Sequence, residues 1–256
     1  MAVPTINAIL NFSTGPATAQ AMQIDIGKIG VNVFADAVAV IVDVSNQVNY
    51  VKTQRGRNSL SDQFQTGQLT LRIIDQNGDF NPLNPSSPYY ELLTPMKKVQ
   101  ITATYSGVTY PIFSGFITSY VNTQPSDATE VAFTTITAVD AFRLGNLAQI
   151  STVTGATAGD LSGTRINQIL DEIDWPATMR DIDAGLTTMQ ADPGTARTSL
   201  QAMQTVTDSE YGALYVDPTG SFTFQDRALT VSSIGALLQC LQIMAQVLDM
   251  PMQYGY

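Results

Sequence analysis

The sequence predicts a mainly β protein with an α+β portion, and three observations support this prediction. From about residue 38 to 139, short apolar runs and turn residues follow one another at hairpin spacing, which is typical of a barrel or a sandwich. After Asp140 the apolar residues recur at helical spacing. A largely apolar run at 229–249, uncharged up to Leu248, then fits one more helix. The expected organisation is a β domain at 1–145, a linker at 146–160, a small α+β domain at 161–227 and a C-terminal helical tail at 228–256.

Strands are expected in the first half wherever β-branched and other apolar residues cluster between turn residues. Residues 3–12 read as a strand or an extended entry arm, and 38–44 is β-branched enough for a buried strand. A shorter strand is predicted at 48–52. Residues 67–74 alternate between apolar and polar side chains, which indicates a half-buried strand.

The dipeptide Asn77-Gly78 is a strong turn signal directly after this last strand. The acidic residues around it raise the alternative of a calcium loop, but the spacing fails. Counted from Asp75, the sixth position is Phe80 where an EF-hand needs glycine, and the twelfth is Ser86 where it needs glutamate. We therefore interpret this cluster as a turn.

A proline-rich arm follows the turn. The three prolines within 81–88 predict an extended segment without a hydrogen-bonded ladder of its own. Beyond the arm, the strands expected from apolar clustering lie at 97–105, 109–113, 115–121 and 130–139, with a turn at Gly107.

The second half of the sequence predicts helices and one hairpin. Thr164 is in position to cap a helix, and Trp175-Pro176 would end that helix. The expected elements after residue 140 are helices at 141–149, 165–173 and 195–209, and a hairpin that joins 213–216 to 221–225.

Composition excludes several classes of function. The net charge of −10 makes a nonspecific grip on nucleic acid unexpected. The chain has no histidine and a single cysteine, Cys240, which excludes Ser-His-Asp, Cys-His and zinc-histidine chemistry and an internal disulfide framework. Only 13% of the residues are charged, about half the usual share, which favours a surface that is partly buried against neighbours.

The sequence does not predict a stable membrane span. The N-terminus lacks a basic region followed by an apolar core, so it does not read as a secretory signal. The most membrane-like stretch is 228–248, which is uncharged but contains several glutamine and serine side chains that are costly in hydrocarbon. We expect this stretch to be a helix buried against protein.

Two sets of residues resemble the minor tail, or baseplate-hub, proteins of long-tailed bacteriophages. The first set is Arg55-Gly56-Arg57, Phe64, Gly67, a strand, Asp75 to Pro82, Asn84, Ser87-Pro88-Tyr89 and Phe113-Ser114-Gly115-Phe116-Ile117. The second set is Arg165-Ile166, Ile169-Leu170-Asp171, Trp175-Pro176, Arg180, Ile182-Asp183, Gly185, Leu200, Glu210, Gly212 to Asp217, Gly220, Phe222, Phe224 and Asp226-Arg227. Together they cover roughly residues 3–227 in the order that this family shows.

The resemblance implies a fold and a location. The first domain would be a β-barrel of the tail-tube type, which packs side by side with its copies into a ring around the DNA-exit channel. The chain would be similar to the central hub of contractile-tail baseplates and would lie in the virion, at the tail tip. This sequence departs from the family after Arg227, where hub proteins continue into strands of a second barrel and this chain enters an uncharged, helix-like tail.

The resemblance also implies partners. The chain would be a homo-oligomer, with a trimer favoured and a hexamer as the alternative. Its neighbours would be a distal tail protein, the tape-measure protein and tail fibre or tip proteins. DNA would be present only in transit through the channel, and no cofactor or metal is implied.

Arg55 and Arg57 are the first candidates for an inter-subunit interface. Alternation along a strand would place both on one face, where an arginine fork can bind carboxylates of a neighbouring subunit. The alternative is that they pair with Asp62 or Asp75 of the same chain, or are solvated.

Four residues of the proline-rich arm are the other interface candidates. They are Asn81, Pro82, Tyr89 and Tyr90. The arm would wrap its own barrel or reach the next subunit, and a plain surface loop is the alternative.

An enzymatic function is a weaker alternative. Tail-associated cell-wall hydrolysis would need paired carboxylates, for which Glu172 with Asp174 or Asp181 with Asp183 are the candidates. A solvated helix face and a turn explain these residues better, so the chain is expected not to be an enzyme.

Two further alternatives stay open. A sugar-binding module of the sandwich type would expose aromatic side chains at loop tips, and Tyr89, Tyr90 and Tyr120 could serve. Within the structural class, the chain could form the hexameric distal tail ring instead of the hub.

Overall fold

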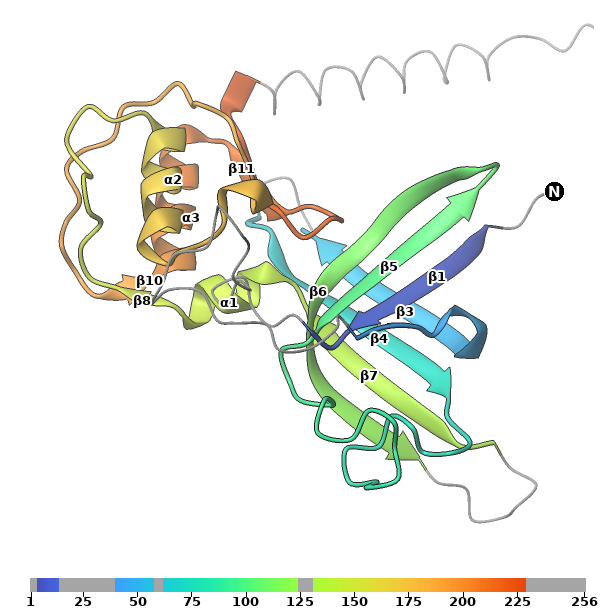
Figure 1. The fold of residues 1–256 in the computed structure, drawn as a ribbon. Coiled ribbons are helices and arrows are strands. Elements are labelled where there is room, and N and C mark those ends of the chain that lie inside the picture. The colour runs from blue at the N-terminus through green and yellow to red at the C-terminus, as the bar shows by residue number, and fades with distance from the viewer. Residues whose placement is uncertain (1–3, 14–39, 58–61, 124–130, 229–256) are drawn as a thin grey trace, which may run out of the picture.

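The computed structural model describes residues 4–13, 40–57, 62–123 and 131–228, and these form a mainly β protein with an α+β portion. A curled sheet makes up the first half, and three helices with two small sheets lie beside one end of it (Figure 1). The predicted fold class is confirmed at this level. The predicted domain boundaries stay a prediction.

The curled sheet has seven strands in the order β2-β1-β5-β6-β7-β4-β3. Every pair of neighbours is antiparallel. The strands are β1 (Thr5–Asn11), β2 (Ile41–Asp43), β3 (Val48–Gly56), β4 (Gln65–Ile74), β5 (Lys98–Tyr105), β6 (Val108–Thr123) and β7 (Phe133–Val139).

The sheet is open, whereas the resemblance implied a closed barrel. Its two edge strands, β2 and β3, follow each other in the chain and are joined through the short 3-10 helix η1 (Ser45–Gln47), so the sheet curls until its edges approach at that end. In the described part of the chain the two edges do not pair. After β2 the backbone turns back to β1 instead, because Val44 N donates to Ala8 O at 2.9 Å and Ala8 N donates to Ser45 Oγ at 3.0 Å.

Apolar side chains fill the concave side of the sheet. The expected alternation of β4 is confirmed, since Leu69, Leu71 and Ile73 are buried and Gln68 is exposed. The members of this core with the largest fully buried side chains are Leu10, Phe12, Leu69, Leu71, Ile73, Phe80, Ile101, Phe113 and Ile117.

β6 is one continuous strand of 16 residues, and the prediction of two strands at 109–113 and 115–121 was wrong. Its first half pairs with β5 and its second half with β7. Gly115 marks a close approach instead of a turn, because a Cβ atom there would lie 2.3 Å from Val139 O. The predicted strand at 48–52 was too short. β3 runs over nine residues, and its pairing with β4 shifts register near each end.

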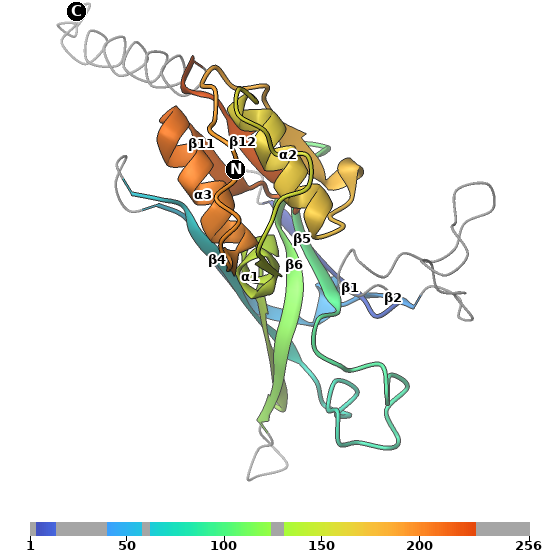
Figure 2. The ribbon, with the colours of Figure 1, turned by 90° about the vertical axis from the view of Figure 1, so that its left-hand side faces the viewer.

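The α+β portion contains three α-helices and two small sheets among the described residues. Its elements are α1 (Ala141–Leu147), β8 (Gln149–Ile150), α2 (Ser162–Glu172), η2 (Ala177–Met179), β9 (Arg180–Ile182), β10 (Arg197–Thr198), α3 (Ser199–Glu210), β11 (Ala213–Val216) and β12 (Phe222–Gln225). Figure 2 shows α2 and α3 lying side by side. The hairpin of β11 and β12 is confirmed, and β12 also pairs in parallel with β9, which the sequence did not predict.

The start of α2 differs from the prediction. The helix begins at Ser162, so Thr164 lies inside its first turn and does not cap it. Tertiary contacts replace the side-chain cap, because the N–H groups of Ser162 and Gly163 each donate at 3.0 Å, to Thr187 O and Ala184 O. These bonds satisfy donors that would otherwise be left free at a helix N-terminus.

A second core holds the α+β portion together. It includes Ile166 of α2, Met203 of α3 and Phe222 of β12, and the ring of Trp175 packs edge-on against Phe222 with centroids 5.0 Å apart. Trp175 is buried directly after α2, in agreement with its predicted place at the helix end.

The predicted C-terminal helical tail lies outside the described residues. Among residues 4–13, 40–57, 62–123 and 131–228, no helix is long and apolar enough to cross a membrane.

Candidate assembly interface

Arg55 connects the curled sheet to the α+β portion within the chain. Its guanidinium donates to Ile112 O of β6 at 3.0 Å and to Val216 O of β11 at 2.6 Å. The side chain therefore reaches from the edge strand β3 across to β6 and to a strand of the second core. The sequence did not predict this role, because backbone carbonyl acceptors leave no signal in the residue types around them.

Neither of the predicted carboxylate partners binds Arg55 or Arg57. No ion pair of the described residues includes either arginine. Asp75 instead accepts hydrogen bonds from the backbone N–H groups of Asp79 and Phe80 and from the Thr134 hydroxyl, at 2.7, 3.1 and 2.7 Å. The interpretation of this cluster as a turn is thereby confirmed.

Arg57 lies against an aromatic pair that continues the junction. Its guanidinium carbon is 4.8 Å from the centroid of the Phe64 ring, and Phe64 packs on Tyr215 of β11 with centroids 5.2 Å apart. Between the two arginines, Gly56 has φ of +105°, in the region that side chains rarely adopt. The glycine lets the chain turn so that Arg55 and Arg57 serve separate contacts.

Asp140 ties the end of β7 to both β4 and α1. Its carboxylate accepts from Gly67 N at 2.6 Å and from Phe142 N at 3.1 Å, and the second bond caps α1. Burial raises the pKa of Asp140 to about 6, against the opposing effects of these two hydrogen bonds and of the Arg55 charge. The absence of a side chain at Gly67 makes room for Asp140 and Arg55, because a Cβ there would lie 2.6 Å from Asp140 Oδ2 and 3.1 Å from Arg55 Cγ.

The turn between β11 and β12 also rests on the sheet. A Cβ atom at Gly220 would lie 3.0 Å from the Ser114 hydroxyl of β6, and Gly220 has φ of +96°. Residues from both sets that carry the sequence resemblance thus meet at one junction: Arg55, Gly67 and Ser114 from the first, Val216 and Gly220 from the second.

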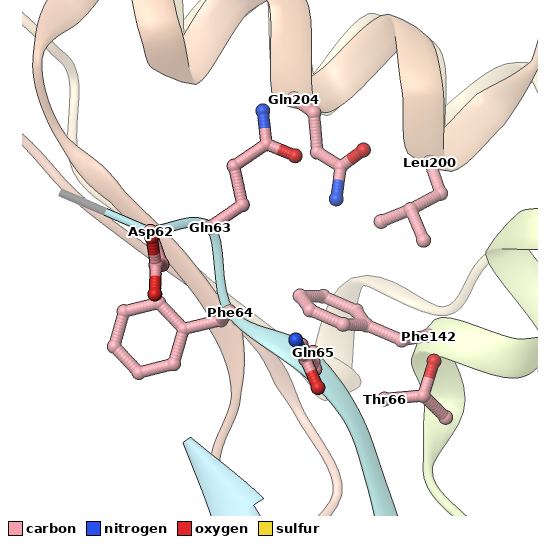
Figure 3. Close-up of a pocket in the computed structure, with 8 residues that line it drawn as sticks. All are labelled: Asp62, Gln63, Phe64, Gln65, Thr66, Phe142, Leu200 and Gln204. Carbon is pink, nitrogen blue, oxygen red and sulfur yellow. The ribbon is translucent and has the colours of Figure 1, made fainter. Parts of the chain in front are cut away.

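A groove of about 620 Å³ lies beside this junction, between the start of β4 and the helices α1 and α3. Figure 3 shows Phe142, Leu200 and Gln204 directed into it. On its rim, Gln63 Nε2 donates to Asp208 Oδ2 at 2.8 Å and adds one more contact between the sheet side and α3.

The proline-rich arm is a row of turns and not the extended segment that was predicted. The backbone N–H groups of Asn81, Asn84, Ser87 and Tyr90 each donate to the carbonyl three residues earlier, at 3.0 to 3.2 Å. Pro82, Pro85 and Pro88 occupy the second position of the last three turns, where the fixed φ of proline fits. We call residues 78–90 the turn array.

Side chains lock the turn array from within. The first residue of each proline turn accepts a bond from the backbone N–H two residues later: Asn81 Oδ1 from Leu83, Asn84 Oδ1 from Ser86 and Ser87 Oγ from Tyr89, each at 3.0 Å. This is the short-range bonding that asparagine and serine favour at turns. A proline at every third position, each preceded by asparagine or serine, is the sequence signal that would have predicted it.

The turn array packs on its own sheet at one side and is open on the other. Tyr89 lies 5.3 Å from the Phe80 ring and 5.5 Å from the Phe12 ring, measured between centroids. Leu83 is 87% exposed and Tyr90 is 44% exposed. Of the interface candidates in the arm, Tyr89 therefore anchors the array to the chain itself, Asn81 and Pro82 shape it, and Tyr90 faces outward.

The carboxylates considered for catalysis lie at the surface. Glu172 and Asp174 are exposed, and Glu172 Oε2 accepts from Thr154 N at 3.2 Å. Asp181 is exposed, and Asp183 accepts from Asp226 N at 3.1 Å. Among the residues that the structure describes, no group of three or more cysteine, aspartate or glutamate side chains is arranged to hold a metal ion.

No protein-family model matches this chain, and no curated protein matches it. Three solved structures show a partial likeness: the 43 kDa tail protein of prophage MuSo2 from Shewanella oneidensis, the tail protein from Neisseria meningitidis MC58, and prophage tail protein gp18 from Listeria monocytogenes EGD-e. Their sequence identities are 14%, 12% and 11%, and their TM-scores are 0.41, 0.41 and 0.42.

The likeness covers 73%, 62% and 87% of this chain and 52%, 41% and 51% of the three proteins. This chain therefore spans about half the length of the structures that it matches.

Proposed function

We propose that this chain is a structural subunit of a bacteriophage tail tip, where its copies form a ring around the DNA-exit channel. In this role it joins the tail tube to distal host-recognition proteins, as a baseplate hub does. The sequence resemblance in the two sets of residues supports the proposal. Its partners would be the distal tail protein, the tape-measure protein and tail fibre or tip proteins.

The open sheet is the observation that carries the proposal. Nine residues of β3 form one edge and three residues of β2 form the other, and neither edge has a partner strand among the described residues. An exposed strand edge presents unpaired N–H and C=O groups and invites pairing with another chain. A ring of copies would satisfy these groups by joining edge to edge.

Three strands of the sheet have a composition that suits a channel wall. β1, β6 and β7 contain no charged side chain, and their polar residues bond one another, for example Thr118 to Thr137 at 2.9 Å and Ser119 to Thr137 at 2.7 Å. A wall of threonine and serine with few cations would let DNA pass without holding it, since phosphate binding depends on lysine and arginine.

Electron microscopy of the purified full-length chain, alone and with its distal tail protein, tests the proposal. We expect rings with a central channel, threefold if the chain is the hub. Sixfold rings would identify it as the distal tail ring, which is the alternative within the same class. A chain that stays monomeric under all these conditions would contradict the ring.

A further inference from the structure

A second groove, of about 530 Å³, lies on the other side of α3, between α3, α2 and the segment that precedes β10. Its floor is apolar. Ile169, Ala202 and Val206 are buried at the base, and half-buried Met189 forms one wall. We call this the α2–α3 groove.

The charged side chains of the α2–α3 groove are neutralised from within. Arg165 donates to Thr157 O at 2.8 Å and to Gln190 O at 2.9 Å and pairs with Asp160 at 3.3 Å, so its side chain is only 5% exposed. Arg197 pairs with Asp192. No free charge of the groove is left for an anionic or cationic ligand, and an uncharged apolar occupant fits the lining best.

The described chain ends beside this groove. Arg227 Nη1 donates to Thr187 Oγ1 at 3.5 Å, and its Nε lies 3.8 Å from Glu210 Oε1. The sequence neighbours of these two residues, Thr188 and Ser209, both line the groove. The chain therefore leaves the described part, at Ala228, within a few residues of the groove opening.

The sequence that follows has the matching chemistry. Residues 229–248 carry no charge and are rich in leucine, isoleucine, valine and methionine. Moving such side chains out of water is favourable, so a segment of this kind is driven onto an apolar surface. We infer that the α2–α3 groove receives apolar side chains from residues 229–248 of the same chain.

Proximity favours the same chain over a second copy as the source. A short tether holds a segment at an effective concentration on the order of millimolar near its attachment point. A segment from another molecule has to compete at the much lower bulk concentration. This inference does not depend on the proposed tail function.

Cys240 permits a direct test, because it is the single cysteine of the chain and lies inside the inferred segment. The variant Thr205→Cys places a second thiol at an exposed position in the groove lining. The matched control Gln68→Cys places it at an exposed position on the sheet. Both full-length proteins are treated with oxidised glutathione under native conditions, and peptide mass spectrometry with non-reducing gels identifies the disulfides.

We expect an intramolecular disulfide with Cys240 in the groove variant, formed roughly tenfold or more faster than in the control. Adding Met189→Asp to the groove variant should slow this reaction, since a carboxylate on the half-buried apolar wall disfavours an apolar segment there. Equal rates in the groove and control variants would overturn the inference. Disulfide-linked dimers without the intramolecular product would also overturn it, and would assign the groove to a second copy.

Discussion

Arg55 shows how one side chain can determine the relation between two cores. Its acceptors, Ile112 O and Val216 O, are backbone atoms, so no exchange of a neighbouring side chain removes them. Any shorter or uncharged replacement leaves at least one carbonyl without its donor. The guanidinium is occupied inside the chain, and an inter-subunit role for Arg55 stays a prediction.

We expect Arg55→Gln to lower the free energy of unfolding by about 1–3 kcal/mol, because two charge-assisted hydrogen bonds are lost at a partly buried site. Urea denaturation measures the change. Arg143→Gln on the exposed side of α1 is the matched control and should change stability by less than about 0.5 kcal/mol. Equal stabilities of the two variants would show that the junction does not depend on Arg55.

Glu210 is the second residue that holds separate segments together. Its Oε2 accepts from Ser162 Oγ at 2.8 Å, Thr187 N at 2.7 Å and Leu186 N at 3.1 Å, at the end of α3. Burial acts to raise the pKa of Glu210, but these hydrogen bonds outweigh it and hold the pKa below its usual value of 4.5. The charged form is therefore the one that the fold favours.

Glu210 and Asp140 should give stability opposite dependences on pH. A lowered folded-state pKa stabilises the fold above the usual value, so the advantage of the natural chain over Glu210→Gln should shrink as the pH falls below 4.5. Asp140, with its pKa raised to about 6, stabilises at low pH and loses that contribution as the pH rises through about 6.

Urea unfolding of the natural chain, Glu210→Gln and Asp140→Asn between about pH 3 and 7 tests both signs. As the pH rises across that range, the free energy of unfolding of the natural chain should fall by about 3 kcal/mol relative to that of Asp140→Asn. Parallel pH profiles for all three proteins would contradict the assignment.

At the scale of elements, the structure separates what local sequence determines from what it does not. The helices at 141–147 and 199–210 and the hairpin of β11 and β12 follow from apolar spacing and from a local cap such as Thr198. The continuity of β6 depends on pairing with β5 along its first half and with β7 along its second half. The predicted break between strands at 109–113 and 115–121 therefore came from local sequence alone.

The candidate site was predictable only in part, because the sequence indicates the residues of the site but not their partners. The sequence singled out Arg55, Gly56, Arg57 and Gly67, and the structure brings all four to the junction. Their partners could not be predicted, because carbonyl oxygens of β6 and β11 carry no residue-type signal. The turn array did carry a signal, and the prediction of an extended arm treated its prolines as ladder breakers instead of turn positions.

Leu83 on the turn array is expected to matter for assembly and not for folding. The variant Leu83→Asp should leave the free energy of unfolding within about 0.5 kcal/mol, because the side chain is 87% exposed. It should weaken self-association roughly tenfold or more, since a carboxylate in place of an apolar contact has to lose its water when the copies associate. Sedimentation velocity over a range of concentrations measures the effect.

Ser86→Asp introduces the same charge at an exposed position of the neighbouring turn and serves as the control. If Leu83→Asp and Ser86→Asp associate equally well, the turn array does not contribute Leu83 to the interface.

At the scale of the whole molecule, the open sheet explains why closure could not be predicted. Strand number and hairpin spacing are visible in the sequence. Closing the sheet into a barrel would also require its two edge strands, β2 and β3, to pair with each other. The segment between them bonds to β1 instead, through the backbone N–H of Val44 and the side-chain hydroxyl of Ser45. The single chain does not close a barrel of the tail-tube type. Its open edges would be paired only in the proposed ring.

Hydrogen exchange distinguishes the two edges from the centre of the sheet. In the dissociated chain, amides of β3 should exchange faster than those of β4, β6 and β7, which have neighbours on both sides. On assembly, protection should rise at β3 while α2, which packs inside the chain, stays unchanged. Unaltered exchange at β3 in assembled particles would rule out joining through that edge.

The turn array is built from three-residue units, so we expect this loop to change in length by three residues at a time. Each Asn-Pro-X or Ser-Pro-X triplet closes its own backbone bond and its own side-chain bond. Removing or adding a whole triplet would leave the turns before and after it in phase, whereas a single inserted residue would shift every later proline out of its position. Relatives of this chain should thus vary the reach of the loop in multiples of three residues, and so tune the spacing to a neighbour without altering the sheet.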